Sequence, residues 1–180
     1  VISLAAIMVV TFSSFFMNYL KLYSKYQSDS LDFNQLAAQS QRIADVLRGA
    51  TDLITVQANT LTAYAYFSPV DAYVSQVSYY KSANGKSLMA DVTPMTANPP
   101  NGTLLTAQKK TYTIINNFYQ PSGGNLFAYY DSTGTALTFP ISDEHTILQI
   151  QVNLAAKATH TSNGQTLSTT VSLRNRKTNL

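Results

Sequence analysis

The sequence predicts an α+β fold in which one long N-terminal helix packs on an antiparallel β-sheet head. The first twenty residues carry no charged side chain, apolar residues recur at helical spacing from Leu36, and turn signals divide the rest into short segments. The 180 residues suffice for one domain with an appendage. We therefore expect a hydrophobic helix at residues 1–27 and a head at 28–180, made of an amphipathic helix at 28–57 and a hairpin-rich sheet.

Composition excludes several classes of protein. The net charge is +3, from 12 basic and 9 acidic residues, which is too small an excess to predict specific nucleic-acid binding. The absence of Cys excludes disulfides and thiolate metal sites. Because the chain beyond the first twenty residues is polar but poor in charge, we expect an extracellular head.

The first twenty residues read VISLAAIMVVTFSSFFMNYL. A helix of this length spans about 30 Å, the thickness of the hydrocarbon layer of a bilayer. Apolar residues are predicted to surround the whole helix, so we expect no polar face. Lys21 and Lys25 follow, interleaved with Tyr side chains, which is typical of a membrane–water interface.

Three interpretations of this segment compete. A cleaved signal peptide is disfavoured, because the segment lacks a basic start and Lys21-Leu22-Tyr23 stands where a small-residue cleavage site belongs. A single-span membrane anchor and a helix that packs against copies of itself remain. If the helix packs against copies of itself, the predicted contact residues are Val1, Leu4, Ile7, Met8, Val9, Phe12, Phe15, Phe16, Tyr19 and Leu20.

Beyond Ser28 the pattern becomes periodic. One predicted face of the continuing helix holds Leu36, Ile43, Leu47, Ala50 and Ile54. No Pro precedes Pro69, so the helix is predicted from Ile2 to about Val56. This stripe requires an apolar partner surface within the head.

Turn signals predict three hairpins. Asn84-Gly85 separates 72–80 from 86–92, Asp131–Gly134 separates 126–130 from 135–139, and Asn163-Gly164 separates 146–158 from 165–174. The last hairpin has one apolar face, formed by Leu148, Ile150, Val152, Leu154, Leu167, Val171 and Leu173. We expect the helical stripe to cover that face.

An apolar N-terminal helix beginning VISLAAIMVV, its amphipathic continuation and a hairpin head resemble the type IV pilins and the pseudopilins of type II secretion. Residues 39–52 and the predicted closing strand at 171–176 resemble the larger, minor-pilin branch. Residues 58–144 match no family pattern. Members of the family begin with a methylated residue, usually Phe, and carry an early Glu. No acidic residue precedes Asp29, so we expect the mature helix to begin about one to two turns before Val1.

The resemblance implies a structural subunit of a bacterial surface filament. Its partners would be copies of itself, the cytoplasmic membrane before assembly, and the pilus assembly machinery. The alternatives are a pseudopilin or minor pilin of a secretion or competence system, and a membrane-anchored adhesin that does not polymerise. We expect no catalytic site and no cofactor, because the sequence offers no nucleophile motif and no Ser/His/acid set by spacing.

Two further features are candidates for sites. Asp143-Glu144-His145 is the strongest metal candidate, but neighbouring residues on a strand point to opposite faces, so we expect a solvated loop. Asn101-Gly102-Thr103 has the form of a glycosylation sequon in a Pro-rich loop. We expect the loops at 93–103 and 119–125 and the turn at 131–134 to be displayed outward, with Tyr119, Tyr129 and Tyr130 beside them.

Overall fold

The computed structural model describes residues 2–157 and 164–174, and their side chains except those of residues 2–7 and 28–32. Within these residues one long helix precedes eight strands, and the fold class is α+β as predicted. The elements are α1 (Ile2–Arg48), β1 (Asp52–Val56), β2 (Thr60–Ala65), β3 (Ser75–Lys81), β4 (Ser87–Pro94), η1 (Thr106–Gln108), β5 (Lys110–Asn116), β6 (Phe127–Tyr130), η2 (Glu144–Thr146), β7 (Gln149–Lys157) and β8 (Gly164–Ser172).

Helix α1 is continuous but shorter than predicted. It ends at Arg48, where the Gly49 N–H still bonds to the Asp45 carbonyl at 3.3 Å, and the chain then turns into β1. Gly is a poor helix former, and the β-branched residues that follow it favour a strand. The prediction of helix to Val56 is therefore wrong.

The same error misplaced one predicted contact. Ile54 lies on β1, and its side chain is 38% exposed, so it does not pack between helix and sheet. Its neighbour Leu53 points the other way and is buried. Alternation along a strand, rather than the helical period, decides which of the two is inside.

The first five strands form an antiparallel meander in the order β1-β2-β3-β4-β5. The predicted hairpin at Asn84-Gly85 is confirmed, since β3 pairs with β4 across it. Gly85 has φ of 69°, and the Asn84 side chain accepts a hydrogen bond from the Lys86 N–H at 2.9 Å. The first strand begins at Ser75 rather than Ala72.

The remaining strands form a second antiparallel sheet in the order β6-β7-β8. The predicted pairing of the last two strands is confirmed, with Ile150 opposite Val171, although the turn before Gly164 lies outside the described residues. Ile150, Val152, Leu154, Val171 and Leu173 are all buried, as predicted. Leu148 and Leu167 are half-buried, and Ile147, which the pattern did not select, is fully buried.

The predicted hairpin at 131–134 forms only in part. The turn is present, with Asp131 accepting backbone hydrogen bonds from Thr133 and Thr135, and with Gly134 at φ of 80°. The return segment, however, forms no strand and meets β6 through the single bridge between Tyr130 and Ala136. The neighbour that β6 pairs with is β7.

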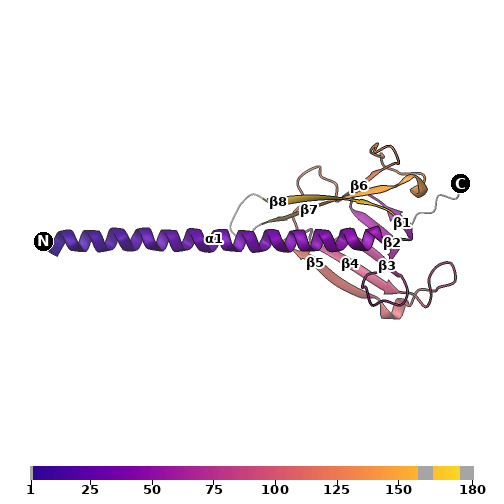
Figure 1. The fold of residues 1–180 in the computed structure, drawn as a ribbon, viewed down its shortest axis with the longest axis horizontal. Helices are drawn as coiled ribbons and strands as arrows, with labels where there is room; N and C mark the ends of the chain where they lie inside the picture. The colour runs from indigo at the N-terminus through magenta and orange to yellow at the C-terminus, as the bar shows by residue number, and fades with distance from the viewer. Residues whose placement is uncertain (1, 158–163, 175–180) are drawn as a thin grey trace.

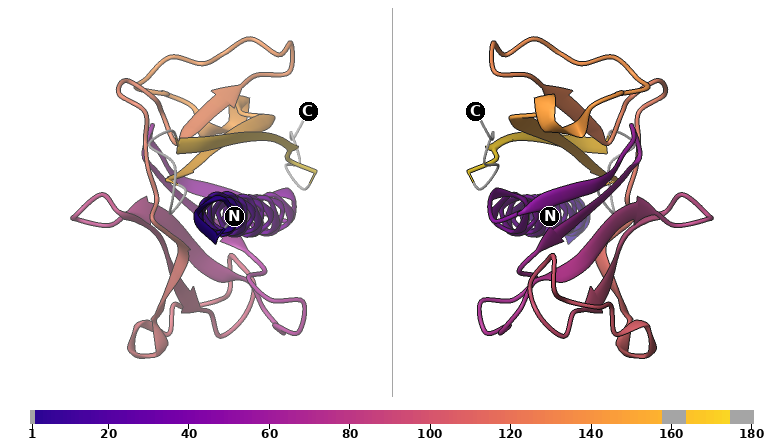
Figure 2. Two further views of the ribbon diagram at one scale, coloured as in Figure 1. Left: turned by 90° about the vertical axis from the view of Figure 1, so that its left-hand side faces the viewer. Right: turned by 90° about the vertical axis from the view of Figure 1, so that its right-hand side faces the viewer.

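The second half of α1 lies between the two sheets, as both views of Figure 2 show. Leu36, Ile43 and Leu47 are buried in the core as predicted, and Ala50 is buried just after the helix. The Ser40 hydroxyl shares a 2.6 Å hydrogen bond with the Thr169 hydroxyl of β8. The head is therefore a helix flanked by two sheets, whereas the sequence predicted a single sheet.

Candidate functional site: the exposed half of the long helix

The first half of α1 extends well beyond the head (Figure 1). Twelve large apolar or aromatic side chains between Met8 and Tyr26 are exposed, including Phe12 and Phe15 at 72%. The head's core cluster begins only at Leu36. A contiguous apolar surface of this extent marks an interaction site in a soluble or membrane-associated protein.

This surface does not surround the helix. Thr11, Ser14, Asn18, Lys21 and Lys25 follow one another at alternating spacings of three and four residues, so they form one polar strip along α1. The expectation of an all-round apolar surface is therefore wrong for the described residues. The strip was not predicted, because its small polar residues are separated in the sequence by longer runs of apolar residues.

Aromatic residues occupy a neighbouring face. Phe12, Phe15, Tyr19, Tyr23 and Tyr26 are also spaced by three and four residues, and all except Tyr23 come one residue after a member of the polar strip. All five are exposed. Aromatic rings supply large apolar area with defined packing geometry, so this face suits packing against another helix.

The exposed side of α1 continues into the head. Ala38 follows Leu20 by five helical turns and therefore lies on the same side, and Ala38, Gln41 and Asp45 are exposed there. The polar strip lies on the other side, since Lys25 precedes the buried Leu36 by about three turns. Where its side chains are described, one side of the helix is thus open: it is apolar before the head and mostly polar beside it.

Part of the predicted assembly surface lies outside the described residues: Val1 entirely, and the side chains of Leu4 and Ile7. The other predicted members, Met8, Val9, Phe12, Phe15, Phe16, Tyr19 and Leu20, are all exposed. Within residues 2–157 and 164–174, no helix combines the length and the apolar character needed to cross a membrane.

The predicted display loops are exposed only in part, since the segment 93–103 begins within β4, and Thr93 and Met95 are buried. Asn101 is exposed, as a modification site requires. Asn98, in contrast, anchors its loop, because its side chain accepts a hydrogen bond from the Val74 N–H at 2.9 Å and donates one to the Tyr66 hydroxyl at 3.2 Å.

The three tyrosines beside these loops differ. Tyr119 is 43% exposed and Tyr130 is half-buried, but Tyr129 is fully buried and donates to the Gln57 carbonyl at 3.1 Å. Burial raises the pKa of Tyr129 far above its usual range, and that of Tyr79 likewise. Tyr129 is therefore a neutral core side chain and does not contact partners.

The Asp143-Glu144-His145 segment has a structural role. Asp143 precedes η2, and its carboxylate accepts a hydrogen bond from the His145 N–H at 2.8 Å, which caps this short helix. Among the described residues, no three His, Cys, Asp or Glu side chains are grouped so that they could hold a metal ion.

The outer face of the five-stranded sheet carries a polar cluster. Asp91 accepts hydrogen bonds from Tyr80 at 3.0 Å and Thr111 at 2.6 Å, and it pairs with Lys109 at 2.7 Å. Partial burial raises the pKa of Asp91, but the bonds from Lys109, Thr111 and Tyr80 outweigh it and hold that pKa below its ordinary value.

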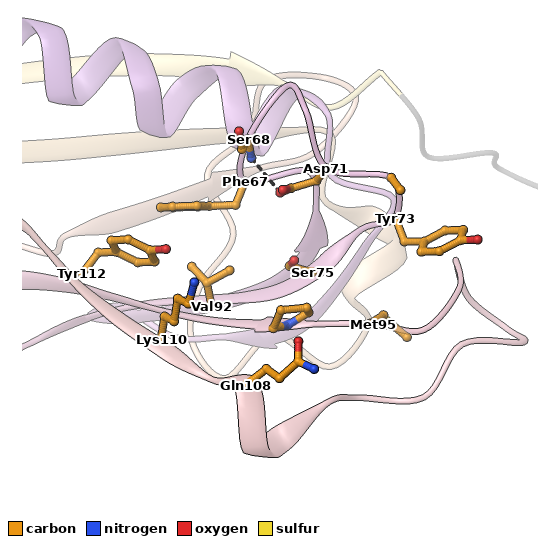
Figure 3. Close-up of a pocket in the computed structure, with 12 residues that line it drawn as sticks. Phe67, Ser68, Asp71, Tyr73, Ser75, Val92, Met95, Gln108, Lys110 and Tyr112 are labelled. Atoms are coloured by element: carbon orange, nitrogen blue, oxygen red, sulfur yellow. Dashed lines mark hydrogen bonds between the residues drawn. The ribbon is translucent and has the colours of Figure 1, made fainter.

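A cavity of about 260 Å³ opens on the opposite, helix-facing side of the same sheet. It lies where β3 begins, β4 ends and β5 begins, under the loop that follows β2. Figure 3 shows Lys110 and Tyr112 reaching into it from β5, with Phe67 above them. The sequence did not predict this site, because Lys109 and Lys110 are adjacent in the sequence, whereas alternation sends their side chains to opposite faces of the sheet.

No protein-family model matches the chain, and a search of curated proteins finds no match either.

Proposed function

We propose that the chain is the structural subunit of a type IV pilus-like filament, which polymerises through the first half of α1. The observation that carries the proposal is the exposed apolar surface between Met8 and Tyr26, which the chain's own head does not cover. At about 25 cal/mol per Å² of apolar area, burying such a surface against neighbours supplies a large driving force for association.

The open side of α1 supports a parallel packing of subunits. Along that side, apolar residues such as Phe16 and Leu20 precede the polar residues Gln41 and Asp45 beside the head. Helices packed along this side would bury their apolar halves together and keep the heads at the periphery. Lys21 and Lys25, on the polar strip, would then face water, a neighbouring acidic group or lipid headgroups.

Matched charge substitutions on the two sides of the helix test this proposal. Phe16→Lys or Val9→Lys places a charge on the apolar side, where an unpaired charge costs several kcal/mol once neighbours exclude water. Asn18→Lys adds the same charge on the polar strip. After detergent removal from the purified full chain, we expect electron microscopy to show helical filaments for the wild type and Asn18→Lys, and none for Phe16→Lys or Val9→Lys. Filaments of Phe16→Lys would contradict the proposal.

The second candidate is a membrane-anchored binding module that does not polymerise. The interleaved Tyr and Lys residues between Tyr19 and Tyr26 favour it, because this combination suits a membrane–water interface. Since the chain contains no Cys, a single introduced Cys reports on helix–helix contact. Leu20→Cys should form disulfide dimers efficiently in a filament while Asn18→Cys should not, whereas a freely diffusing anchor gives low and equal yields for both.

A further inference from the structure

The cavity beside β5 exists because α1 covers only part of the sheet. Ser75, Val92 and Lys110 lie on three neighbouring strands. Val92 pairs with Lys110 on one side and with Val77 on the other, and Ser75 comes two residues before Val77. They share the helix-facing side of the sheet. The loop after β2 closes the space from above, held by the Asp71 carboxylate, which accepts a hydrogen bond from the Ser68 N–H at 2.9 Å.

The wall of the cavity combines aromatic surface with fixed geometry. The rings of Phe67 and Tyr112 lie 5.0 Å apart between centroids, and the Arg42 guanidinium lies 4.7 Å from the centroid of the Phe67 ring. Arg42 thus holds Phe67 in place by a cation–π contact. Phe67 is buried and Tyr112 is 38% exposed, so the ring of Tyr112 is the accessible part of this wall.

Several polar side chains around the cavity have no bonded partner among the described residues. Within residues 2–157 and 164–174, no side-chain hydrogen bond or ion pair joins Ser75, Gln108, Lys110 or the Tyr112 hydroxyl to another residue. Ser75 is only 4% exposed, yet it lines the cavity. On the other side of the same strands, Tyr80, Lys109 and Thr111 each bond to Asp91. Gln108, Lys110 and Tyr112 are exposed, so their polar groups contact solvent and are available to a ligand that enters the cavity.

We propose that this cavity binds one pyranose unit that carries a carboxylate, such as a hexuronic acid. The volume of about 260 Å³ lies just below the range of drug-sized pockets, which suits a single ring. The C–H face of the sugar packs on Tyr112 and Val92. Its hydroxyls bond to Ser75, Gln108 and the free oxygen of Asp71.

The charges at the two ends of the cavity orient the ligand. Lys110 is the only cation among the residues that line it, and Figure 3 shows its ammonium group pointing into the space between Tyr112 and Val92. A carboxylate there forms a charge-assisted hydrogen bond, which is stronger than a neutral one. Asp71 lies on the far wall with the loop and accepts from hydroxyl donors instead. A sugar with its carboxylate near Lys110 and its hydroxyls near Asp71 and Ser75 satisfies both ends.

Ligand-observed NMR on the full chain in detergent micelles tests the proposal with glucuronate, glucose and glutamate as probes. We expect saturation transfer to glucuronate and an affinity at least about tenfold lower for Lys110→Gln, because one charged hydrogen bond is lost. Lys86→Gln removes the same charge from the distant β3–β4 turn and should leave binding unchanged. Tyr112→Phe, which keeps the ring, should weaken binding less than Lys110→Gln.

Several outcomes would overturn the proposal. In the first three, glucuronate fails to bind, glucose binds as tightly as glucuronate does, or glutamate binds more tightly than glucuronate does. Wild-type affinity for glucuronate in a Lys110→Gln variant that is folded by circular dichroism is the fourth such outcome. If Lys110→Gln fails to fold, Ser75→Ala is the second variant, and unchanged binding there also refutes the assignment. The site is independent of the proposed filament: Phe16→Lys should bind glucuronate normally even where it abolishes assembly.

Discussion

Replacing Leu47 with Ala measures how strongly the head holds the long helix. Leu47 is fully buried in the core cluster, in the half of α1 that lies between the two sheets. The substitution removes three carbon atoms, which corresponds to about 2.4 kcal/mol of lost transfer free energy. Because hydrogen-bonded sheets on both sides resist collapse into the gap, the cavity adds to this loss. We therefore expect the free energy of unfolding to fall by about 3–5 kcal/mol.

Urea unfolding of the full chain in mild detergent, followed by Tyr fluorescence, gives the measurement. With an m-value of about 2 kcal/mol per M, the midpoint should fall by about 1.5–2.5 M. Leu22→Ala is the matched control, because it makes the same change in the same helix at a side chain that is 49% exposed. A midpoint for Leu47→Ala within about 0.3 M of the Leu22→Ala midpoint would refute the packing of this half of α1 between the two sheets.

Other predictions concern the head and its loops. Folding lowers the pKa of Asp91, so the stability that this carboxylate contributes is present above its unfolded pKa and is lost as pH falls through its folded pKa. The difference in urea midpoint between the wild type and Asp91→Asn should therefore shrink as pH falls from about 5 to 2. A difference that stays constant over this range would contradict the prediction. Gly102→Ala should lower the melting temperature, since an added Cβ would lie 1.8 Å from the Ala97 carbonyl oxygen, whereas Gly124→Ala, with its nearest atom at 3.2 Å, should be milder. Deleting residues 96–102 should spare filament assembly but remove the Asn98 anchor, so a head that melts earlier and still assembles is the expected result by calorimetry and microscopy. A chain that begins at Ser28 should be monomeric and β-rich by light scattering and circular dichroism, and aggregation would show that residues 8–27 complete the core.

The sequence predicted the elements whose signals are local. The periodic residues Leu36, Ile43 and Leu47 identified the buried face of α1, and Asn84-Gly85 identified a hairpin, because each pattern is imposed by the geometry of one element. The boundary at Arg48 was missed, because Ile54 continues the helical spacing by coincidence while also suiting a strand. Only pairing with β2 decides between the two states.

Features that depend on how elements meet were not predictable. The second sheet is formed because β6 pairs with β7 rather than with the segment after Gly134, a choice between two partners of similar local propensity. The cavity beside β5 was even less predictable from the sequence, because it brings Phe67, Ser75 and Lys110 together from three separate segments. The exposure of the apolar half of α1 followed from sequence, whereas its polar strip required a residue-by-residue reading of the helix.

Along one side of α1, the exposed residues change from apolar before the head to mostly polar beside it. Beside the head, the side that continues the polar strip is buried between the sheets, and the opposite side carries Ala38, Gln41 and Asp45 toward solvent. Before the head, the side of the helix that continues Ala38, Gln41 and Asp45 is apolar, and the opposite side holds Lys21 and Lys25. In the proposed filament, a neighbouring helix packed on this open side would contact the apolar residues before the head and the exposed residues beside it. The charged strip disfavours equally close packing from the other side.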